Sequence, residues 1–322
     1  MNRQENRQTL RSLALLGFKL KSRPASPDLH SMEVVETECA DTRGSVSEIA
    51  TNLELGEHGI WFSKGKSNIS YPSEGNAACF EIEDDSFWFQ HRNRCITSVV
   101  HGFPPAGTIF DLGGGNGFVA LGLQQRGWRS IVVEPGITGA VNARKRGLEV
   151  ICATFEDAHF RLHSLPAVGL FDVLEHIEDG GQFLRMLGER LIVGGRIYLT
   201  VPAYRWLWSA EDVSAGHFRR YTLSSLARVL GQSGFDVEFA SYIFSPLPVP
   251  ILLKRTIPTL LGRRKTENFD EAIREHRGGS STVQSLAGSV FKWELQRLER
   301  KRTIPAGGSC LVVAKSVAGG AR

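Results

Sequence analysis

The feature that most constrains the fold is an apolar strand that ends in an acid and runs into a glycine-dense turn. Residues 108–112 have strand character, and Asp111 lies near the end of that stretch. Glycine permits positive φ and close approach of the backbone to a ligand. Residues 118–123 resume with helical spacing, so a helix N-terminus would face whatever binds at the turn. The segment predicts a nucleotide-type cofactor site whose turn contains Gly113, Gly114, Gly115 and Gly117.

Two classes of cofactor site use such a turn. The dinucleotide pattern G-x-G-x-x-G/A fits Gly115, Gly117 and Ala120, and Glu134 lies near the distance expected for its ribose-binding acid. That pattern leaves Asp111 and the first two glycines unexplained. The spacing D-x-G-x-G-x-G over residues 111–117 includes them. It resembles motif I of class I S-adenosylmethionine (SAM)-dependent methyltransferases, in which an acid ends the first strand and the loop passes the methionine part of the cofactor.

Later segments resemble this family in chain order. A second strand at 130–133 leads to Glu134, which in the family accepts hydrogen bonds from both ribose hydroxyls. A third strand at 149–153 precedes the region of the adenine contacts, and a fourth at 168–171 leads into DVLEHIED, typical of small-molecule methyltransferases. Further strands are expected at 196–201, after a turn at Gly194 and Gly195, and at 237–244 and 309–314. The cofactor-binding residues that the resemblance implies are Asp111, Gly113, Gly114, Gly115, Asn116, Gly117, Glu134, Glu156 and Asp172.

The fold that this resemblance implies is α/β and Rossmann-like, with a seven-stranded, mostly parallel sheet and helices on both faces. An N-terminal extension and a helical insertion before the last strand are added to it. Phe87, Trp88 and Phe89 either cover the cofactor as a lid or pack on the sheet as part of a helix. The expected segments are a partly mobile tail (1–60), a helical or lid region (61–105), the SAM-binding core (106–245), a basic and apolar insertion (246–303), and the last strand with a tail (304–322).

Polar candidates for catalysis follow the fourth and fifth strands. Asp172, Glu175 and His176 would face one way on a turn or helix. Their D-x-x-E-H pattern resembles the cation-binding E-x-x-E-H of ubiquinone-biosynthesis and small-RNA O-methyltransferases, so the three are candidate Mg²⁺ ligands; helix capping or ion pairing is the alternative. His217 is a candidate base, with Asp172 and His176 as further catalytic candidates, and ion pairing is again the alternative. The candidate substrate-binding residues are Tyr204, Trp208, Asp212, Arg219, Arg220 and Tyr221.

Composition and charge further limit the compartment and the partners to be expected. The 322 residues include five cysteines, an odd number without CxxC spacing, which favours neither a disulfide framework nor a zinc site and predicts a cytoplasmic protein. The net charge of +4 divides into +12 on residues 1–28 and 246–322 and −8 on residues 29–245, so no nucleic-acid partner is expected. Residues 246–265 combine apolar and cationic side chains, so they either pack on the core or contact the inner face of a membrane peripherally.

The expected function is transfer of a methyl group from SAM to a small-molecule, lipid-linked or glycan-type acceptor, with oxygen as the expected acceptor atom. Such a reaction needs mainly positioning and a base, because the methyl donor is already activated. Two alternatives stay open at this point. One is an NAD(P)-dependent Rossmann oxidoreductase, and the other is a non-catalytic SAM-binding or membrane-associated module.

Overall fold

The computed structural model describes residues 46–64, 79–80, 82–263 and 281–317. All of them belong to one compact unit that spans residues 43–322. The predicted tail before residue 46, part of the lid region and the middle of the insertion lie outside the described residues. None of the helices that the structure describes is long and apolar enough to span a bilayer.

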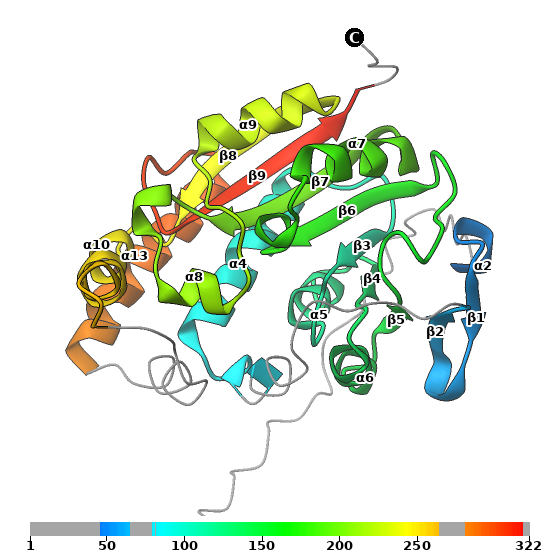
Figure 1. Cartoon of the computed structure of the whole chain (residues 1–322), viewed down its shortest axis with the longest axis horizontal. Helices are drawn as coiled ribbons and strands as arrows, with labels where there is room; N and C mark the ends of the chain where they lie inside the picture. Colours follow the sequence, from blue (N-terminus) through cyan, green and yellow to red (C-terminus); the bar gives the residue numbers. More distant parts are fainter. Residues whose placement is uncertain (1–45, 65–78, 81, 264–280, 318–322) are drawn as a thin grey trace, which may run out of the picture. The chain divides into compact units, whose positions relative to one another are not determined.

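A nine-stranded sheet forms the centre of this unit (Figure 1). Its order is β1-β2-β5-β4-β3-β6-β7-β9-β8, and among these strands β9 runs antiparallel to both neighbours and β1 antiparallel to β2. The remaining pairs are parallel. The strands are β1 (Leu53–Leu55), β2 (Ile60–Ser63), β3 (Ile109–Leu112), β4 (Ser130–Val133), β5 (Glu149–Cys152), β6 (Leu165–Phe171), β7 (Leu191–Pro202), β8 (Phe235–Ile243) and β9 (Ser309–Ser316).

The seven strands β5, β4, β3, β6, β7, β9 and β8 are those expected from the sequence. Two short strands, β1 and β2, extend the sheet beyond β5. Ile60, Trp61 and Phe62 of β2 pair in parallel with Val150, Ile151 and Cys152. These strands have only three and four residues and precede the segment that carries the resemblance, so no motif marks them. The predicted turn at 194–195 also differs, because those glycines lie inside β7 at a shift in its register with β6.

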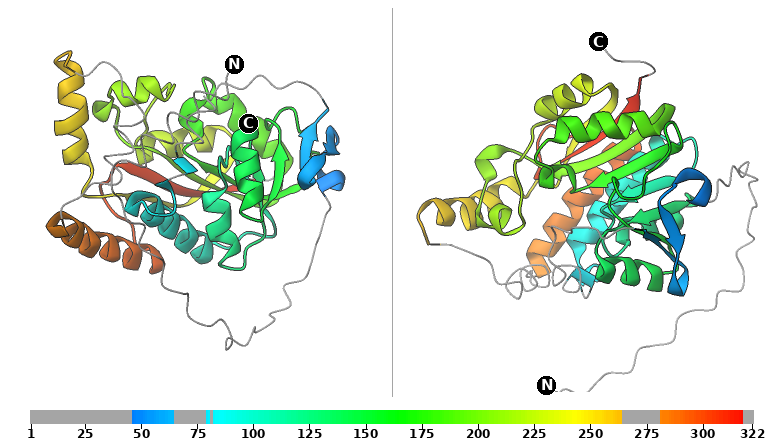
Figure 2. Two further views of the ribbon diagram at one scale, coloured as in Figure 1. Left: turned by 90° about the horizontal axis from the view of Figure 1, so that it is seen from below. Right: turned by 45° about the vertical axis from the view of Figure 1, so that its right-hand side comes forward.

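Helices cover both faces of the sheet (Figure 2). Side chains of α4, α5 and α13 pack against one face, and α6 packs there with α5 over the strands β4 and β5. Side chains of α7 and α9 pack against the opposite face. Strands that are buried on both faces consist of continuous apolar runs in the sequence, which is why residues 130–133 and 168–171 were recognisable. The longer helices are α4 (Phe87–Gly102), α5 (Phe118–Gln124), α6 (Ile137–Lys145), α7 (Gly180–Arg190), α9 (Leu223–Gln232) and α13 (Ser281–Glu299).

Short helical elements complete the connections. The segment between β8 and β9 begins with three helical elements over residues 248–260 that follow one another without a break. The middle element is a π-turn. Pro258, which has no N–H to donate to the helical ladder, lies two residues after the end of the π-turn at Thr256. These elements are α2 (Val46–Ile49), α8 (Ala210–Ser214), α10 (Pro248–Ile251), α11 (Ile257–Leu260), the 3₁₀-turns η1 (Glu57–Gly59), η2 (Leu174–His176) and η3 (Arg205–Leu207), and the π-turn η4 (Leu252–Thr256).

Candidate functional site

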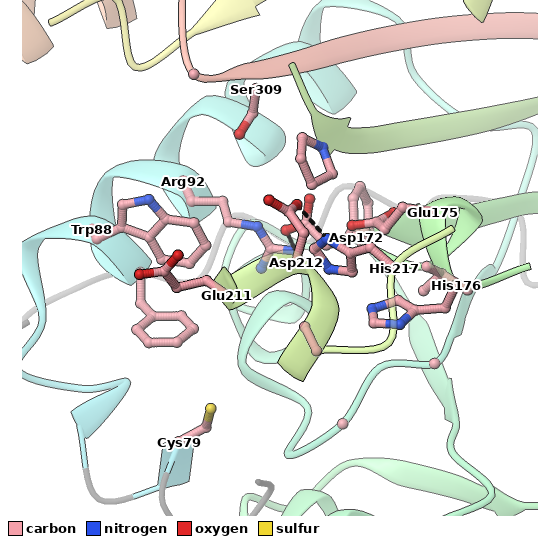
Figure 3. Close-up of a pocket in the computed structure, with 18 of the residues that line it drawn as sticks. Cys79, Trp88, Arg92, Asp172, Glu175, His176, Glu211, Asp212, His217 and Ser309 are labelled. Carbon is pink, nitrogen blue, oxygen red and sulfur yellow. Dashed lines mark hydrogen bonds and ion pairs between the residues drawn. The ribbon is translucent and has the colours of Figure 1, made fainter. Parts of the chain in front are cut away.

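A cavity of about 950 Å³ lies where the glycine turn, the start of α4 and the loops after β6 and β7 meet. It collects residues from distant parts of the sequence, because the carboxyl ends of β3, β4, β6 and β7 reach the same edge of the sheet. Figure 3 shows the polar side chains that reach into it. The residues of its wall lie within the ranges 79–92, 111–119, 134–135, 171–176, 211–220 and 247–255, together with Pro202, Gly308 and Ser309.

The glycine turn connects β3 to α5 by a backbone path that only glycine follows without strain. Gly113, Gly115 and Gly117 all have positive φ, between 54° and 75°. A Cβ on Gly113 would lie 2.8 Å from a methyl carbon of Val173, and one on Gly117 would lie 2.4 Å from Leu148. The turn therefore needs glycine for its shape as well as for access. Gly113, Gly114, Gly115 and Asn116 line the cavity, whereas Gly117 acts as the N-cap of α5.

Asp111 lies buried at the end of β3 with its carboxylate at the cavity wall. Burial raises the pKa of this carboxyl to about 7, although the nearby Arg92 opposes the rise. Its Oδ2 has no hydrogen-bond partner among the described residues. A buried carboxylate oxygen without a partner costs free energy, so this atom is suited to accept a hydrogen bond from a cationic ligand group.

Glu134 follows β4 and binds two backbone amides of the cavity wall. Its Oε2 accepts a hydrogen bond from Gly115 N at 2.9 Å, and its Oε1 accepts one from Gly136 N at 2.7 Å. A carboxylate has about four acceptor positions. Glu134 therefore fixes the turn against β4, and its side chain lines the cavity.

Arg92 of α4 connects the region preceding the core to the DVLEH segment. Its Nη2 lies 2.6 Å from Oδ2 of Asp172, and the arginine side chain is only 10% exposed. Asp172 has φ 60°, an uncommon value for a residue other than glycine, and such conformations gather at functional sites. At the start of α4, Phe87, Trp88 and Phe89 line the cavity, while the rest of the helix packs on the sheet. The segment therefore has features of both a lid and a packed helix.

His217 and Asp212 form a hydrogen-bonded pair on the opposite wall. His217 Nδ1 lies 2.8 Å from Oδ1 of Asp212, and Arg220 Nε donates to the same oxygen at 2.7 Å. Burial alone would raise the pKa of Asp212, but these hydrogen bonds lower it to about 2. The carboxylate is therefore ionised near neutral pH and accepts the proton on His217 Nδ1, which leaves Nε2 of that ring as a proton acceptor.

The three predicted Mg²⁺ ligands do not converge in the structure. Asp172 pairs with Arg92, and the ligating atoms that lie within 4.8 Å of one another belong to Glu175, His176 and His217. Burial, followed by the charge of Asp172, raises the pKa of Glu175 well above its usual value. Burial and His217 lower the pKa of His176 to about 4. Two of the predicted ligands, Glu175 and His176, therefore lie together with His217, and Asp172 is not part of that group.

Other predicted residues lie outside the cavity wall. Glu156 is exposed and borders a separate pocket with Phe155 and His159, away from the glycine turn. Tyr204 stacks between Trp206 and Tyr242. The cavity therefore brings together Asp212 and Arg220 of the predicted substrate-binding group, whereas Tyr204, Trp208, Arg219 and Tyr221 do not line it.

The sequence interpretation did not identify several residues of this wall. Glu83 accepts a hydrogen bond from Asn116 at 3.2 Å and pairs with Arg146 of the segment after α6 at 3.1 Å. It thereby ties the segment before α4 to the glycine turn. Lys254 and Arg255, from the insertion, also reach the cavity. Their clustered positive charge was visible in the sequence, but its position at the site depends on the fold.

The comparisons with known proteins agree with this geometry. Residues 83–239 match the family model described as methyltransferase domain. A comparison with curated proteins found no match. A chain in the complex of the Haloferax volcanii Trm112 methyltransferase activator with the putative methyltransferase is 16% identical, with a TM-score of 0.51 over 77% of this chain and 97% of that one.

Two further solved structures are similar at lower scores. Haemonchus contortus phosphoethanolamine N-methyltransferase 2, in complex with SAM, is 17% identical with a TM-score of 0.49 over 80% of this chain. The match spans 62% of the length of that enzyme. A possible histamine N-methyltransferase from Thermotoga maritima is 16% identical with a TM-score of 0.47, over 76% of this chain and 99% of that chain. Residues 83–239 of the present chain are a methyltransferase domain, and the sheet that they help to build has the fold of the class I SAM-dependent methyltransferases.

Proposed function

We propose that this protein transfers a methyl group from SAM to a small-molecule acceptor, at an oxygen atom. The observation that carries the proposal is the convergence in one cavity of two different sets of side chains. Asp111, Glu134 and the glycine turn form one wall, and the pair of His217 and Asp212 belongs to another. The first set suits a cationic nucleoside cofactor, and the second suits the removal of a proton from an acceptor.

The cofactor wall fits SAM on three grounds. The Oδ2 atom of Asp111, without a partner among the described residues, suits the ammonium group of the methionine part. Two backbone amides fix the carboxylate of Glu134 at the cavity wall, where its oxygens suit the hydroxyls of a ribose. Gly113, Gly114 and Gly115 line the cavity without side chains, so a ligand can approach the backbone of the turn closely. When bound, SAM supplies a methyl group on a sulfonium, which is already activated for transfer.

His217 has the geometry of a general base for the acceptor hydroxyl. Asp212 holds Nδ1 of the ring at 2.8 Å and remains ionised, so Nε2 is the position that accepts a proton. Arg220 fixes the same carboxylate and prevents it from turning away. His176, whose ring centroid lies 4.7 Å from that of His217, stays neutral near pH 7 and does not compete as a second cation.

The cofactor assignment is tested by equilibrium binding of SAM to matched glutamate variants. Glu134→Gln should weaken binding on the order of 100-fold, because a charged acceptor of two hydroxyl groups is lost. Glu156→Gln is the control, since Glu156 follows the next strand but lies outside the cavity. Equal affinities in the two variants would contradict the proposed cofactor wall.

The catalytic assignment is tested by transfer of labelled methyl groups from SAM into a fractionated small-molecule extract. His217→Ala should leave the affinity for SAM unchanged and lower transfer by about 100-fold, within the range expected for a general base. His101→Ala, at an exposed position of α4, is the control and should keep full transfer. Full transfer by His217→Ala would remove this residue from the mechanism.

A further inference from the structure

The helical segment 248–261 carries a row of exposed apolar side chains that the methyl-transfer reaction does not explain. Their spacing of i, i+4, i+8, i+11 and i+12 places them on one side of a helix. Their exposed fractions range from 37% for Ile257 to 78% for Leu260. We call this set the apolar stripe, and it consists of Val249, Leu253, Ile257, Leu260 and Leu261.

The same segment contributes other side chains to the cavity wall. Pro250, Ile251, Lys254 and Arg255 line the cavity, and Thr256 holds the segment to the body through a hydrogen bond to Leu207 O at 3.1 Å. Figures 1 and 2 show α10 and the elements that follow it at the edge of the unit. The stripe therefore belongs to an outer element whose other residues form part of the site.

The charged residues within the segment that carries the stripe are all basic. Residues 246–265 contain five Lys or Arg and no Asp or Glu. Of these cations, Lys254 and Arg263 are exposed in the structure. Interfacial segments that bind anionic lipid surfaces have this composition: exposed apolar side chains and cations, without acids, on one short helix.

We propose that the apolar stripe docks on an anionic lipid membrane, with its aliphatic side chains among the acyl chains and the adjacent cations among the headgroups. This surface is independent of the proposed methyl transfer. A second copy of the chain fits less well, because pairing two stripes would bring together two segments that each contain five cations and no acid. The first 28 residues of the chain contain six Lys or Arg and two Asp or Glu, so their net charge is also positive. They are therefore no better suited to cover the stripe.

Docking is tested by flotation of the full chain with vesicles. The protein should float with vesicles of phosphatidylglycerol and phosphatidylcholine in equal parts and remain below with pure phosphatidylcholine. Raising the salt concentration should reduce flotation, because headgroup attraction is screened. No flotation with the anionic vesicles at low salt, or equal flotation with both kinds, would overturn the proposal.

The stripe itself is tested by a pair of matched double variants. Leu253→Gln with Leu260→Gln removes two stripe side chains that are 58% and 78% exposed. Leu55→Gln with Leu162→Gln is the control, since both leucines are 60% exposed and lie elsewhere in the unit. The first variant should partition to anionic vesicles at least about tenfold less, and the control should partition as the unmodified chain does.

Two outcomes would overturn the assignment to the stripe. One is equal partition of both double variants. The other is a dimer of the unmodified chain, without lipid, that becomes a monomer only in the stripe variant. The second outcome, read by light scattering, would show that a copy of the chain covers the stripe. Far-UV circular dichroism of both variants confirms that they are folded, as expected for substitutions at exposed positions.

Discussion

Replacing Asp111 by asparagine is expected to stabilise the folded protein while weakening its binding of SAM. Burial raises the pKa of this carboxyl from 3.8 to about 7. The unfolded chain therefore releases its proton at lower pH than the folded chain does. Between these two pH values the folded state binds more protons, so its stability falls as the pH rises.

The size of the effect follows from the same two pKa values. A difference of about three units corresponds to roughly 4 kcal/mol of lost stability once the pH exceeds 7. Asparagine keeps the shape of the side chain and has no charge to bury. Asp111→Asn should therefore raise the free energy of unfolding by up to about 4 kcal/mol at pH 8. The gain should be smaller by roughly 2.5 kcal/mol at pH 5, where the native carboxyl is protonated.

Urea denaturation without cofactor, at pH 5 and pH 8, measures both values. Asp236→Asn, at an exposed position of β8, is the matched control and should change stability little at either pH. Calorimetry should show that Asp111→Asn binds SAM about tenfold more weakly, since a charged acceptor for the ammonium group is lost. A variant that is no more stable than the unmodified chain at pH 8, or whose gain is the same at both pH values, would refute this reasoning.

Three further perturbations have effects of defined sign on the free energy of unfolding. Gly117→Ala should lower the free energy of unfolding by about 2–3 kcal/mol, because its Cβ would lie 2.4 Å from Leu148 at φ 75°. Gly127→Ala, at φ 84° with no atom within 4 Å, should lower it by only about 1 kcal/mol. Equal losses in urea titrations would argue against a steric contribution at Gly117. Glu294→Gln should destabilise by roughly 2–4 kcal/mol, since this carboxylate accepts hydrogen bonds from two amides and a histidine, and an unchanged thermal midpoint would contradict that role. Asp212→Asn should lower the free energy of unfolding by about 2 kcal/mol near pH 6, and by progressively less as the pH falls from 3.8 toward 2. This pH dependence is opposite to that of Asp111. A loss of stability that is independent of pH would exclude the ionised carboxylate of Asp212 as the cause.

The cofactor wall was predictable because its chemistry lies in short segments of the chain. One strand and one turn contain Asp111 and the glycines, and Glu134 ends the next strand at the neighbouring edge. The seven central strands follow from apolar runs for the same reason, since residues buried on both faces leave a continuous signal. The hairpin of β1 and β2 left little signal, because its strands are three and four residues long.

The acceptor side was predictable only in part, because tertiary pairing decides which side chains face the cavity. His217 and Asp212 lie five residues apart and form a hydrogen bond, which the prediction of Asp212 as a substrate-binding residue did not include. Asp172 pairs with Arg92, 80 residues earlier in the chain, and is not among the clustered ligand atoms of Glu175, His176 and His217. Glu156 follows a strand as Glu134 does, yet it borders another pocket. Spacing alone does not distinguish these two glutamates.

The most direct test of the central claim is calorimetric titration of the full chain with SAM, S-adenosylhomocysteine and NAD(H) in parallel. The cavity formed by Asp111, Glu134 and the glycine turn predicts saturable binding of SAM and S-adenosylhomocysteine, at about −8 kcal/mol for micromolar affinity, and no binding of NAD(H). Binding of NAD(H) without SAM would contradict the assignment of this cavity to a methyl donor.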